Sequence, residues 1–226
     1  MALNGHVKYE TISALIRARA AGLRLILITG RELPDLLRVF HQIDLFDLLV
    51  VENGAVLFWP STRIEKSLCS TPAEAFVAAL QRHQVSPLSV GRCVVATLRP
   101  FEATVQEVIN EMQLDWQIAL NRESVMVLPA GVNKATGLKA ALAELGIVAA
   151  AVVGIGDAEN DAPFLAECGL AVAVANAIDS LKDQADLVTQ APGGDGVVEC
   201  ITNLLASDAI APVPLPPEDN ARTRVG

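Results

Sequence analysis

The sequence predicts an α/β fold, because short aliphatic runs alternate with helical patterns along the chain. Two of these runs, residues 23–28 and 151–155, end in polar or glycine residues that lead into a helix. The composition agrees, since 52% of the 226 residues are hydrophobic but only 4% are aromatic and 19% are charged, which suggests aliphatic packing. A chain of this length can hold a core and an inserted subdomain.

The first elements are a helix predicted over residues 10–21 and a buried strand over residues 23–28. The strand ends in Thr29 and Gly30, and Pro34 marks the start of the next helix. The Thr29 hydroxyl and the backbone amides near Gly30 can hold phosphate oxygens, and the dipole of that helix favours negative charge. The alternative is a Thr-Gly turn that binds nothing.

Two short strands, residues 47–51 and 55–58, are predicted around Glu52-Asn53-Gly54. This tripeptide suits a tight turn whether or not a ligand lies near it. Trp59 and Pro60 then mark a boundary. From residue 60 to residue 129 the pattern predicts an inserted unit with helices over residues 72–83 and 101–112 and strands over residues 93–98 and 124–128.

Lys134 opens the next predicted helix, an amphipathic run that Gly146 ends. A cation at a helix N-terminus opposes the helix dipole, so its position there indicates a phosphate or carboxylate to neutralise. The alternative is a solvated surface lysine.

The segment from Gly156 to Pro163 is the most informative part of the sequence. It places Asp157, Asn160 and Asp161 directly after an apolar strand, on a turn that enters a helix predicted over residues 161–167. Two carboxylates four residues apart can converge on one Mg²⁺ ion, with phosphate and water completing its shell. The alternative is that Asp157 and Asn160 only cap the helix.

The chain continues through predicted strands at residues 170–174 and 186–189 to a last helix at residues 197–205. Asn176 and Asp195 lie in turns between these elements. From residue 207 the sequence is rich in proline and polar residues, which predicts a flexible tail or linker to a fused or separate partner domain.

Taken in order, the strand ending in Thr29-Gly30-Arg31, the helix-opening Lys134 and the strand followed by Gly156-Asp157 resemble the haloacid dehalogenase (HAD) superfamily of phosphohydrolases. Glu52-Asn53-Gly54-Ala55 extends the resemblance to the branch with a large α/β cap. The resemblance implies a Rossmann-like core with a parallel sheet at residues 1–59 and 130–206, an inserted cap at residues 60–129, and a tail at residues 207–226.

The resemblance also implies roles for individual residues. It implies catalytic roles for Lys134 and Thr29, phosphate binding by these two with Gly30 and Asn160, and Mg²⁺ binding by Asp157 with Asp161 as a ligand or a supporting group. The activity would be phosphate monoester hydrolysis through an aspartyl-phosphate. The expected substrate is a small phosphorylated metabolite, either a sugar phosphate or a phosphoglycolate-like acid.

One motif of the family is missing, since the sequence contains no Asp-x-Asp. In relatives this motif ends the central strand of the sheet and supplies the nucleophile and the general acid/base. Without that strand, buried backbone groups of the neighbouring strands stay unpaired, at roughly 1–3 kcal/mol each. We expect that the chain as given begins too late in a longer enzyme; the alternatives are a strand from another chain or split gene, or an inactive relative.

The alternative function, of a different class, is a non-catalytic pseudo-phosphatase or a regulatory module that binds Mg²⁺ or phosphate. The net charge of −9, without a basic cluster, argues against nucleic acid, and no apolar run is long enough for a membrane span. The absence of a secretory pattern favours the cytoplasm. The four cysteines have no metal-binding or dithiol spacing, so we expect them to act as small buried hydrophobic residues.

Overall fold

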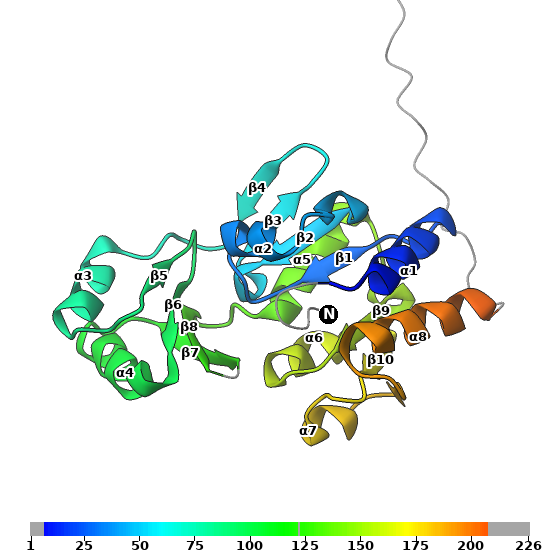
Figure 1. The fold of residues 1–226 in the computed structure, drawn as a ribbon. Helices are drawn as coiled ribbons and strands as arrows, with labels where there is room; N and C mark the ends of the chain where they lie inside the picture. The colour runs from blue at the N-terminus through cyan, green and yellow to red at the C-terminus, as the bar shows by residue number, and fades with distance from the viewer. Residues whose placement is uncertain (1–6, 122, 208–226) are drawn as a thin grey trace, which may run out of the picture.

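The computed structural model describes residues 7–121 and 123–207 (Figure 1). Its core contains two sheet fragments, and a smaller α/β unit is inserted between them in the sequence. No helix in these described ranges combines the length and the apolar character that a membrane span requires. The predicted tail falls at residues 208–226, outside the described part of the chain.

The first sheet fragment has the strand order β1-β2-β3-β4. Its strands are β1 (Ile26–Ile28), β2 (Leu48–Val51), β3 (Val56–Trp59) and β4 (Ile64–Ser67). β1 and β2 are parallel, whereas β3 and β4 are antiparallel to their neighbours, because their short connections leave no room for a crossover helix. Since β4 pairs with β3, residues 64–67 belong to the core sheet, and the inserted unit begins after them rather than at residue 60.

The helical elements of this first part are short except for the first one. They are α1 (Tyr9–Ala20), α2 (Leu33–Val39) and two 3₁₀ turns, Ile43–Leu45 and Glu52–Gly54. Helix α1 buries Ala14, Leu15 and Ala18 against the core, as its apolar face predicts.

The second sheet fragment contains three parallel strands in the order β11-β10-β9. Its strands are β9 (Val153–Gly156), β10 (Leu170–Ala173) and β11 (Leu187–Val188). The helical elements around it are α5 (Lys134–Leu145), α6 (Ala162–Leu165), α7 (Asp179–Lys182), α8 (Gly193–Ala206) and the 3₁₀ turns Ala149–Ala151 and Glu159–Asp161. The helix predicted over residues 161–167 is therefore a 3₁₀ turn followed by a single helical turn.

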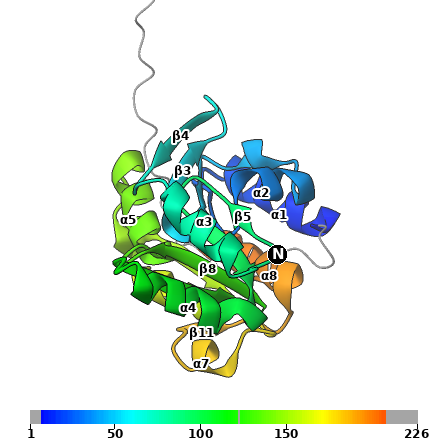
Figure 2. The same cartoon turned by 90° about the vertical axis from the view of Figure 1, so that its left-hand side faces the viewer.

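The inserted unit, which we call the cap, has an antiparallel sheet of order β5-β6-β8-β7. Its elements are α3 (Glu74–Arg82), β5 (Ser89–Val90), β6 (Val95–Leu98), a 3₁₀ turn (Arg99–Phe101), α4 (Glu102–Glu111), β7 (Trp116–Asn121) and β8 (Ser124–Pro129). Both helices cover the sheet face that points away from the core (Figures 1 and 2). The other sheet face, which includes Met126, lies toward the core.

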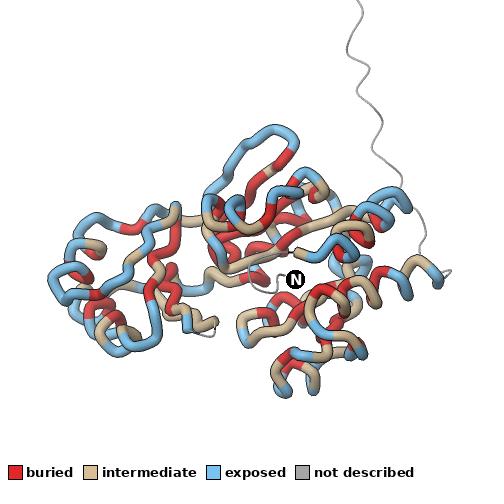
Figure 3. Tube along the Cα trace, viewed as in Figure 1, coloured by how far each residue is buried: buried red, intermediate tan, exposed pale blue. Residues whose placement is uncertain are grey.

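The two core fragments face one another through β1 and β9, and no strand of the described residues pairs with both. Helices α1 and α8 pack together over one face of the core, while α5 contacts β1, β2 and α6 on the other. The strand β2 is completely buried, whereas β1 and β9 alternate between buried and half-buried residues (Figure 3). Among the described strands, β1 and β9 at the middle of the molecule are thus less buried than β2.

Candidate functional site

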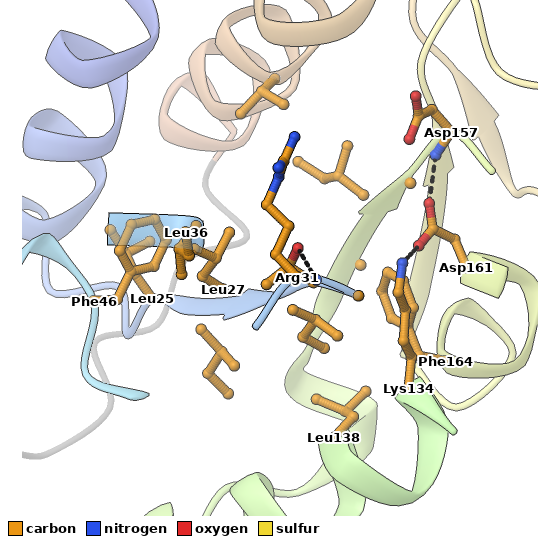
Figure 4. A pocket seen from close by; sticks show the side chains of 18 of the residues that line it. Leu25, Leu27, Arg31, Leu36, Phe46, Lys134, Leu138, Asp157, Asp161 and Phe164 are labelled. Atoms are coloured by element: carbon orange, nitrogen blue, oxygen red, sulfur yellow. Dashed lines mark hydrogen bonds and ion pairs between the residues drawn. The ribbon is translucent and has the colours of Figure 1, made fainter. Parts of the chain in front are cut away.

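A cavity of about 1460 Å³ begins at the carboxyl ends of β1 and β9 and extends between the two strands. Its polar end is lined by Thr29, Gly30, Lys134, Asp157 and Asp161. Figure 4 shows Lys134, Asp161 and Asp157 at one side of the pocket and apolar residues at the other. The structure therefore brings together residues that are more than a hundred positions apart in the sequence.

Lys134 is placed by the N-terminus of α5, which is fixed in two ways. The Asn133 side chain accepts hydrogen bonds from the backbone N–H groups of Ala135 and Thr136, and the Thr136 hydroxyl accepts one from the Asn133 backbone N–H. Gly54 packs directly against the N-terminus of α5, since a Cβ atom on Gly54 would lie 1.9 Å from the Asn133 carbonyl oxygen. The turn after β2 thus holds the start of α5.

Lys134 and Asp161 form a buried ion pair. The Lys134 Nζ lies 2.5 Å from Asp161 Oδ1, and the two residues are only 5% and 6% exposed. The other oxygen, Asp161 Oδ2, accepts hydrogen bonds from the backbone N–H groups of Asp157 and Ala158 at 2.8 and 3.0 Å. Both carboxylate oxygens are thus engaged, so Asp161 orients the ammonium group and the loop that carries Asp157.

Asn160 connects Lys134 to the first sheet fragment. Its Oδ1 accepts a hydrogen bond from Lys134 Nζ at 3.2 Å, and its Nδ2 donates to Asn53 Oδ1 at 3.1 Å. Asn53 is buried and has a left-handed backbone with φ of 56°. This polar chain joins the turn after β2 to the turn after β9 and to α5.

Thr29 and Gly30 lie at the end of β1, beside the cap. The Thr29 hydroxyl accepts a hydrogen bond from the Arg31 backbone N–H, while the Thr29 backbone is held by β2 and the following turn. A Cβ atom on Gly30 would lie 3.0 Å from the Met126 sulfur and 3.9 Å from Asn160 Nδ2. The strand end therefore lies within contact distance of both the cap and the second sheet fragment.

The donor set fits a metal ion that takes few protein ligands. Among the described residues no three histidine, cysteine, aspartate or glutamate side chains group closely enough to hold an ion by themselves. Mg²⁺ commonly uses one or two carboxylates and completes its shell with water and phosphate oxygens. Asp157 and Asp161 are the two carboxylates at the polar end of the cavity, and Asp161 is also engaged by Lys134.

Glu52 is a functional candidate that the sequence did not indicate. It is 2% exposed, and its carboxylate accepts hydrogen bonds from the backbone N–H groups of Arg92, Cys93 and Val94 in the cap, at 2.8–3.0 Å. Gly91 allows this approach, because a Cβ atom there would lie 2.7 Å from the carboxylate. Glu52 thus links the cap to the turn that carries Asn53.

The remaining polar candidates have structural partners. Asn176 Oδ1 accepts a hydrogen bond from the Gly193 backbone N–H at 2.6 Å, and Asp195 forms an exposed ion pair with Lys8 at 2.7 Å. The cysteines are free thiols, of which Cys93 and Cys200 are buried and Cys69 and Cys168 half-buried. Burial and the neighbouring Cys93 raise the pKa of Cys69 to about 12, so this thiol is protonated at neutral pH.

Comparison with known proteins decides the family. The model of the haloacid dehalogenase-like hydrolases matches residues 2–92 and 98–201. The chain belongs to this family. The HAD chain is 30% identical over 201 residues to a phosphoglycolate phosphatase of Methanothermobacter thermautotrophicus, covering 87% of this chain and 90% of that protein. It is 28% identical to phosphoglycolate phosphatase 2 of Saccharolobus solfataricus, covering 91% and 87%.

Solved structures of other HAD proteins share the fold. A haloacid dehalogenase-like hydrolase from Bacteroides thetaiotaomicron superposes with a TM-score of 0.76 at 18% identity, covering 87% of this chain and 92% of that chain. A sugar phosphatase of HAD subclass IIB gives a TM-score of 0.70 at 20% identity, covering 88% and 92%. The α/β core with its inserted cap is therefore the HAD fold.

Proposed function

We propose that this HAD chain carries the phosphate and Mg²⁺ site of a phosphomonoester phosphatase. The observation that carries the proposal is the buried Lys134, which is aimed by Asp161 and Asn160 at the polar end of the cavity. These two partners use two of the three N–H donors of the ammonium group, which leaves the third for a phosphate oxygen. An ammonium group held by partners on one side can donate a charge-assisted hydrogen bond to an anion on the other.

Thr29 and Gly30 would complete the phosphate site from the other side of the cavity. The Thr29 hydroxyl can donate to a phosphate oxygen while it accepts from Arg31, and Gly30 lines the same end of the cavity. Asn160 would act through Lys134 by holding its ammonium group in place. When bound, Mg²⁺ would be held by Asp157 and would neutralise charge on the phosphate oxygens.

The substrate that we propose is a small phosphorylated metabolite, either a phosphoglycolate-like acid or a sugar phosphate. The two relatives named above are phosphoglycolate phosphatases, and one neighbour in structure is a sugar phosphatase. Cap residues Ser89, Asn121, Ser124 and Met126 line the same cavity, so the cap limits the size of a molecule bound at Lys134.

Hydrolysis through an aspartyl-phosphate also needs a carboxylate nucleophile, and the sequence contains no Asp-x-Asp pair to provide it. We therefore propose that the 226-residue chain binds Mg²⁺ and phosphate without turnover. p-Nitrophenyl phosphate with Mg²⁺ should be hydrolysed no faster by this chain than by its Asp157→Ala variant. Turnover clearly above that variant would contradict the proposed lack of a nucleophile, and the non-catalytic alternative with it.

Binding tests the site itself. Isothermal titration with 2-phosphoglycolate and Mg²⁺ should show binding that Lys134→Met weakens by about ten- to a hundredfold, because a hydrogen bond to a charged group contributes about 1.5–3 kcal/mol. Lys139→Met is the matched control, since this lysine lies on the same helix with a 60% exposed side chain. Equal binding by both variants would exclude Lys134 from the site.

The metal assignment has its own test, because Lys134→Met also removes the ion-pair partner of the buried Asp161 and could disturb the loop that carries Asp157. Asp157→Asn should remove most of the Mg²⁺ binding and leave the melting temperature close to that of the wild type. Asp179→Asn is the control, because the Asp179 side chain is 98% exposed. Unchanged Mg²⁺ affinity in Asp157→Asn would exclude Asp157 from the metal site.

A further inference from the structure

The turn between β2 and β3 contacts each part of the protein that forms or covers the candidate site. We call residues 52–55 the Glu52 turn. Its first two residues have left-handed backbones, with φ of 51° at Glu52 and 56° at Asn53. Residues other than glycine seldom adopt this conformation, and they keep it only where the surrounding structure holds them. The contacts of the Glu52 turn therefore determine its shape.

The backbone of the Glu52 turn bonds the strand end that carries Thr29. The Glu52 N–H group donates to the Arg31 carbonyl oxygen at 2.9 Å, and the Asn53 N–H group donates to the Thr29 carbonyl oxygen at 3.0 Å. Glu52 and Asn53 are both buried, so water offers no ready replacement for a lost bond. A rotation of the turn thus moves the peptide groups around Thr29.

The Asn53 side chain connects the same turn to Lys134. Asn53 Oδ1 accepts a hydrogen bond from Asn160 Nδ2 at 3.1 Å, and Asn160 Oδ1 accepts one from Lys134 Nζ at 3.2 Å. Among the described residues, Asn160 and Asp161 are the two hydrogen-bond partners of the ammonium group. A displaced Asn53 therefore removes the support of Asn160 and leaves the Lys134 ammonium group held by Asp161.

The Glu52 side chain connects the turn to the cap. Its carboxylate accepts the backbone N–H groups of Arg92, Cys93 and Val94 at 2.9, 2.8 and 3.0 Å. Hydrogen bonds to a charged acceptor are stronger than those to a neutral one, so these three bonds hold the carboxylate firmly. Since Glu52 and Asn53 are adjacent, a single peptide unit separates the cap contact from the contact that leads to Lys134.

We propose that Glu52 is a positioning residue for phosphate binding, so that the affinity at Lys134 depends on the cap segment 91–94. The inference rests on the proposed function, in which Lys134 and Thr29 hold the phosphate. The carboxylate acts only through the turn: it keeps the left-handed conformation, and the turn holds Thr29 and the Asn53–Asn160 pair. Such a coupling is reciprocal, so phosphate binding stabilises the bonds from Glu52 to the cap by the same free energy.

The charge of Glu52 by itself predicts the opposite effect on phosphate binding. A carboxylate repels a phosphate dianion, so its neutralisation in Glu52→Gln would strengthen binding if charge alone mattered. Glutamine has nearly the same size but accepts the three cap N–H groups weakly, so loss of positioning predicts weaker binding. The sign of the change in affinity therefore separates the two roles.

Calorimetry with 2-phosphoglycolate and Mg²⁺ measures this change on the full chain. Glu52→Gln should weaken binding about tenfold, which lies within the usual range for coupled sites. Glu65→Gln is the matched control and should leave the affinity unchanged, because Glu65 contacts Arg92 of the cap only through an exposed pair at 3.1 Å. A lower melting temperature with unchanged affinity in Glu52→Gln would show a merely structural role, and tighter binding an electrostatic one; either result overturns the proposal.

A double-variant cycle tests whether Glu52 acts through Asn53. Asn53→Gly removes the side chain that bonds Asn160 and introduces a residue suited to the left-handed backbone. Each single variant should weaken 2-phosphoglycolate binding, but the double variant should bind more tightly than the product of the two losses predicts, because both act on the same contact to Lys134. Losses that multiply would show that Glu52 acts independently of Asn53, contrary to the proposal.

The same contact can be disturbed from the cap side. A Cβ atom on Gly91 would lie 2.7 Å from the Glu52 carboxyl carbon, so Gly91→Ala displaces the carboxylate or the cap segment. It should weaken 2-phosphoglycolate binding in the native protein and have little effect in the Glu52→Gln background. If Glu52→Gln fails to fold, Gly91→Ala decides, and unchanged affinity in that variant contradicts the proposal.

A readout without phosphate separates this inference from the proposed function. The side-chain NH₂ resonances of Asn160, identified by their loss in Asn160→Ala, report its bond to Asn53. In Glu52→Gln and in Gly91→Ala they should shift toward their position in Asn53→Gly, and unchanged resonances would overturn the inference. If the native chain binds no 2-phosphoglycolate, the proposed function fails, while these resonances still decide whether Glu52 positions the partner of Lys134.

Discussion

At the scale of single residues, the site depends on a chain of buried polar side chains rather than on isolated charges. Three successive hydrogen bonds join four side chains from three different elements: Asn160 donates to Asn53, and Lys134 donates to both Asn160 and Asp161. Removing one partner of such a network leaves a buried group unpaired, which costs more than the hydrogen bond alone contributes. The network therefore fixes the ammonium group within a part of the core that would otherwise exclude charge.

Glu52 connects this network to the cap, so a substitution of Glu52 should change the stability of the cap residues that it contacts. Glu52→Gln replaces a carboxylate that accepts three backbone hydrogen bonds by a neutral group that accepts them weakly, so we expect a loss of about 1–3 kcal/mol. Urea unfolding measures this loss. Hydrogen exchange at Arg92, Cys93 and Val94 should accelerate in the folded protein.

Glu65→Gln is the control for that substitution. Glu65 also contacts the Arg92 residue, but through an exposed side-chain pair at 3.1 Å, which contributes little. If both variants lose the same stability, the Glu52 carboxylate does not hold residues 92–94 of the cap.

At the scale of elements, the position of α5 depends on two glycines that touch. A Cβ atom on Gly137 would lie 2.5 Å from Gly54 Cα and 2.6 Å from Val50 Cγ1. The turn after β2 and the first turn of α5 thus approach as closely as their backbones permit. This contact brings Lys134 to the carboxyl edge of the sheet.

The Gly137→Ala substitution has two opposing effects on the free energy of unfolding. Alanine in a helix interior is favoured over glycine by about 1 kcal/mol. The new methyl group meets backbone atoms that cannot move without shifting α5, and overpacking of this kind costs about 1–3 kcal/mol. We expect net destabilisation and weaker phosphate binding, measured by thermal unfolding and calorimetry. Lys139→Ala, on the exposed side of the same helix, should change neither; a more stable Gly137→Ala variant would show that α5 has room to shift.

Much of this arrangement could be predicted from the sequence, and the exceptions have physical causes. The aliphatic runs at residues 23–28 and 151–155 predicted strands, which β1 and β9 confirm, and Thr29 and Asp157, predicted as phosphate and Mg²⁺ ligands, line the same cavity. β7 was not predicted, since its residues are all half-buried and show no clear alternation. The role of Glu52 could not be predicted, because its partners are backbone amides about forty residues away in the cap.

At the scale of the whole molecule, the two core fragments are held together by helices and polar contacts rather than by one continuous sheet. α1 packs on α8 over one face, with Lys8 and Asp195 paired at the rim. On the other face α5 contacts both fragments. The interior between them keeps a cavity that a continuous sheet would fill.

The open interior should be detectable by a hydrophobic dye. The native chain should bind 8-anilinonaphthalene-1-sulfonate, because apolar side chains of α1, α5 and α8 line an accessible cavity. Dye fluorescence equal to that of a fully packed protein would show that the cavity closes in solution.

The recessed position of the two open strand edges also bears on solubility. Unpaired edges usually invite sheets of other molecules to join, which leads to aggregation. Here helices α1 and α8 on one face and α5 on the other cover both edges, so a second folded sheet cannot reach them. The net charge of −9 adds mutual repulsion between copies, so the open edges inside the core need not lead to sheet-to-sheet association.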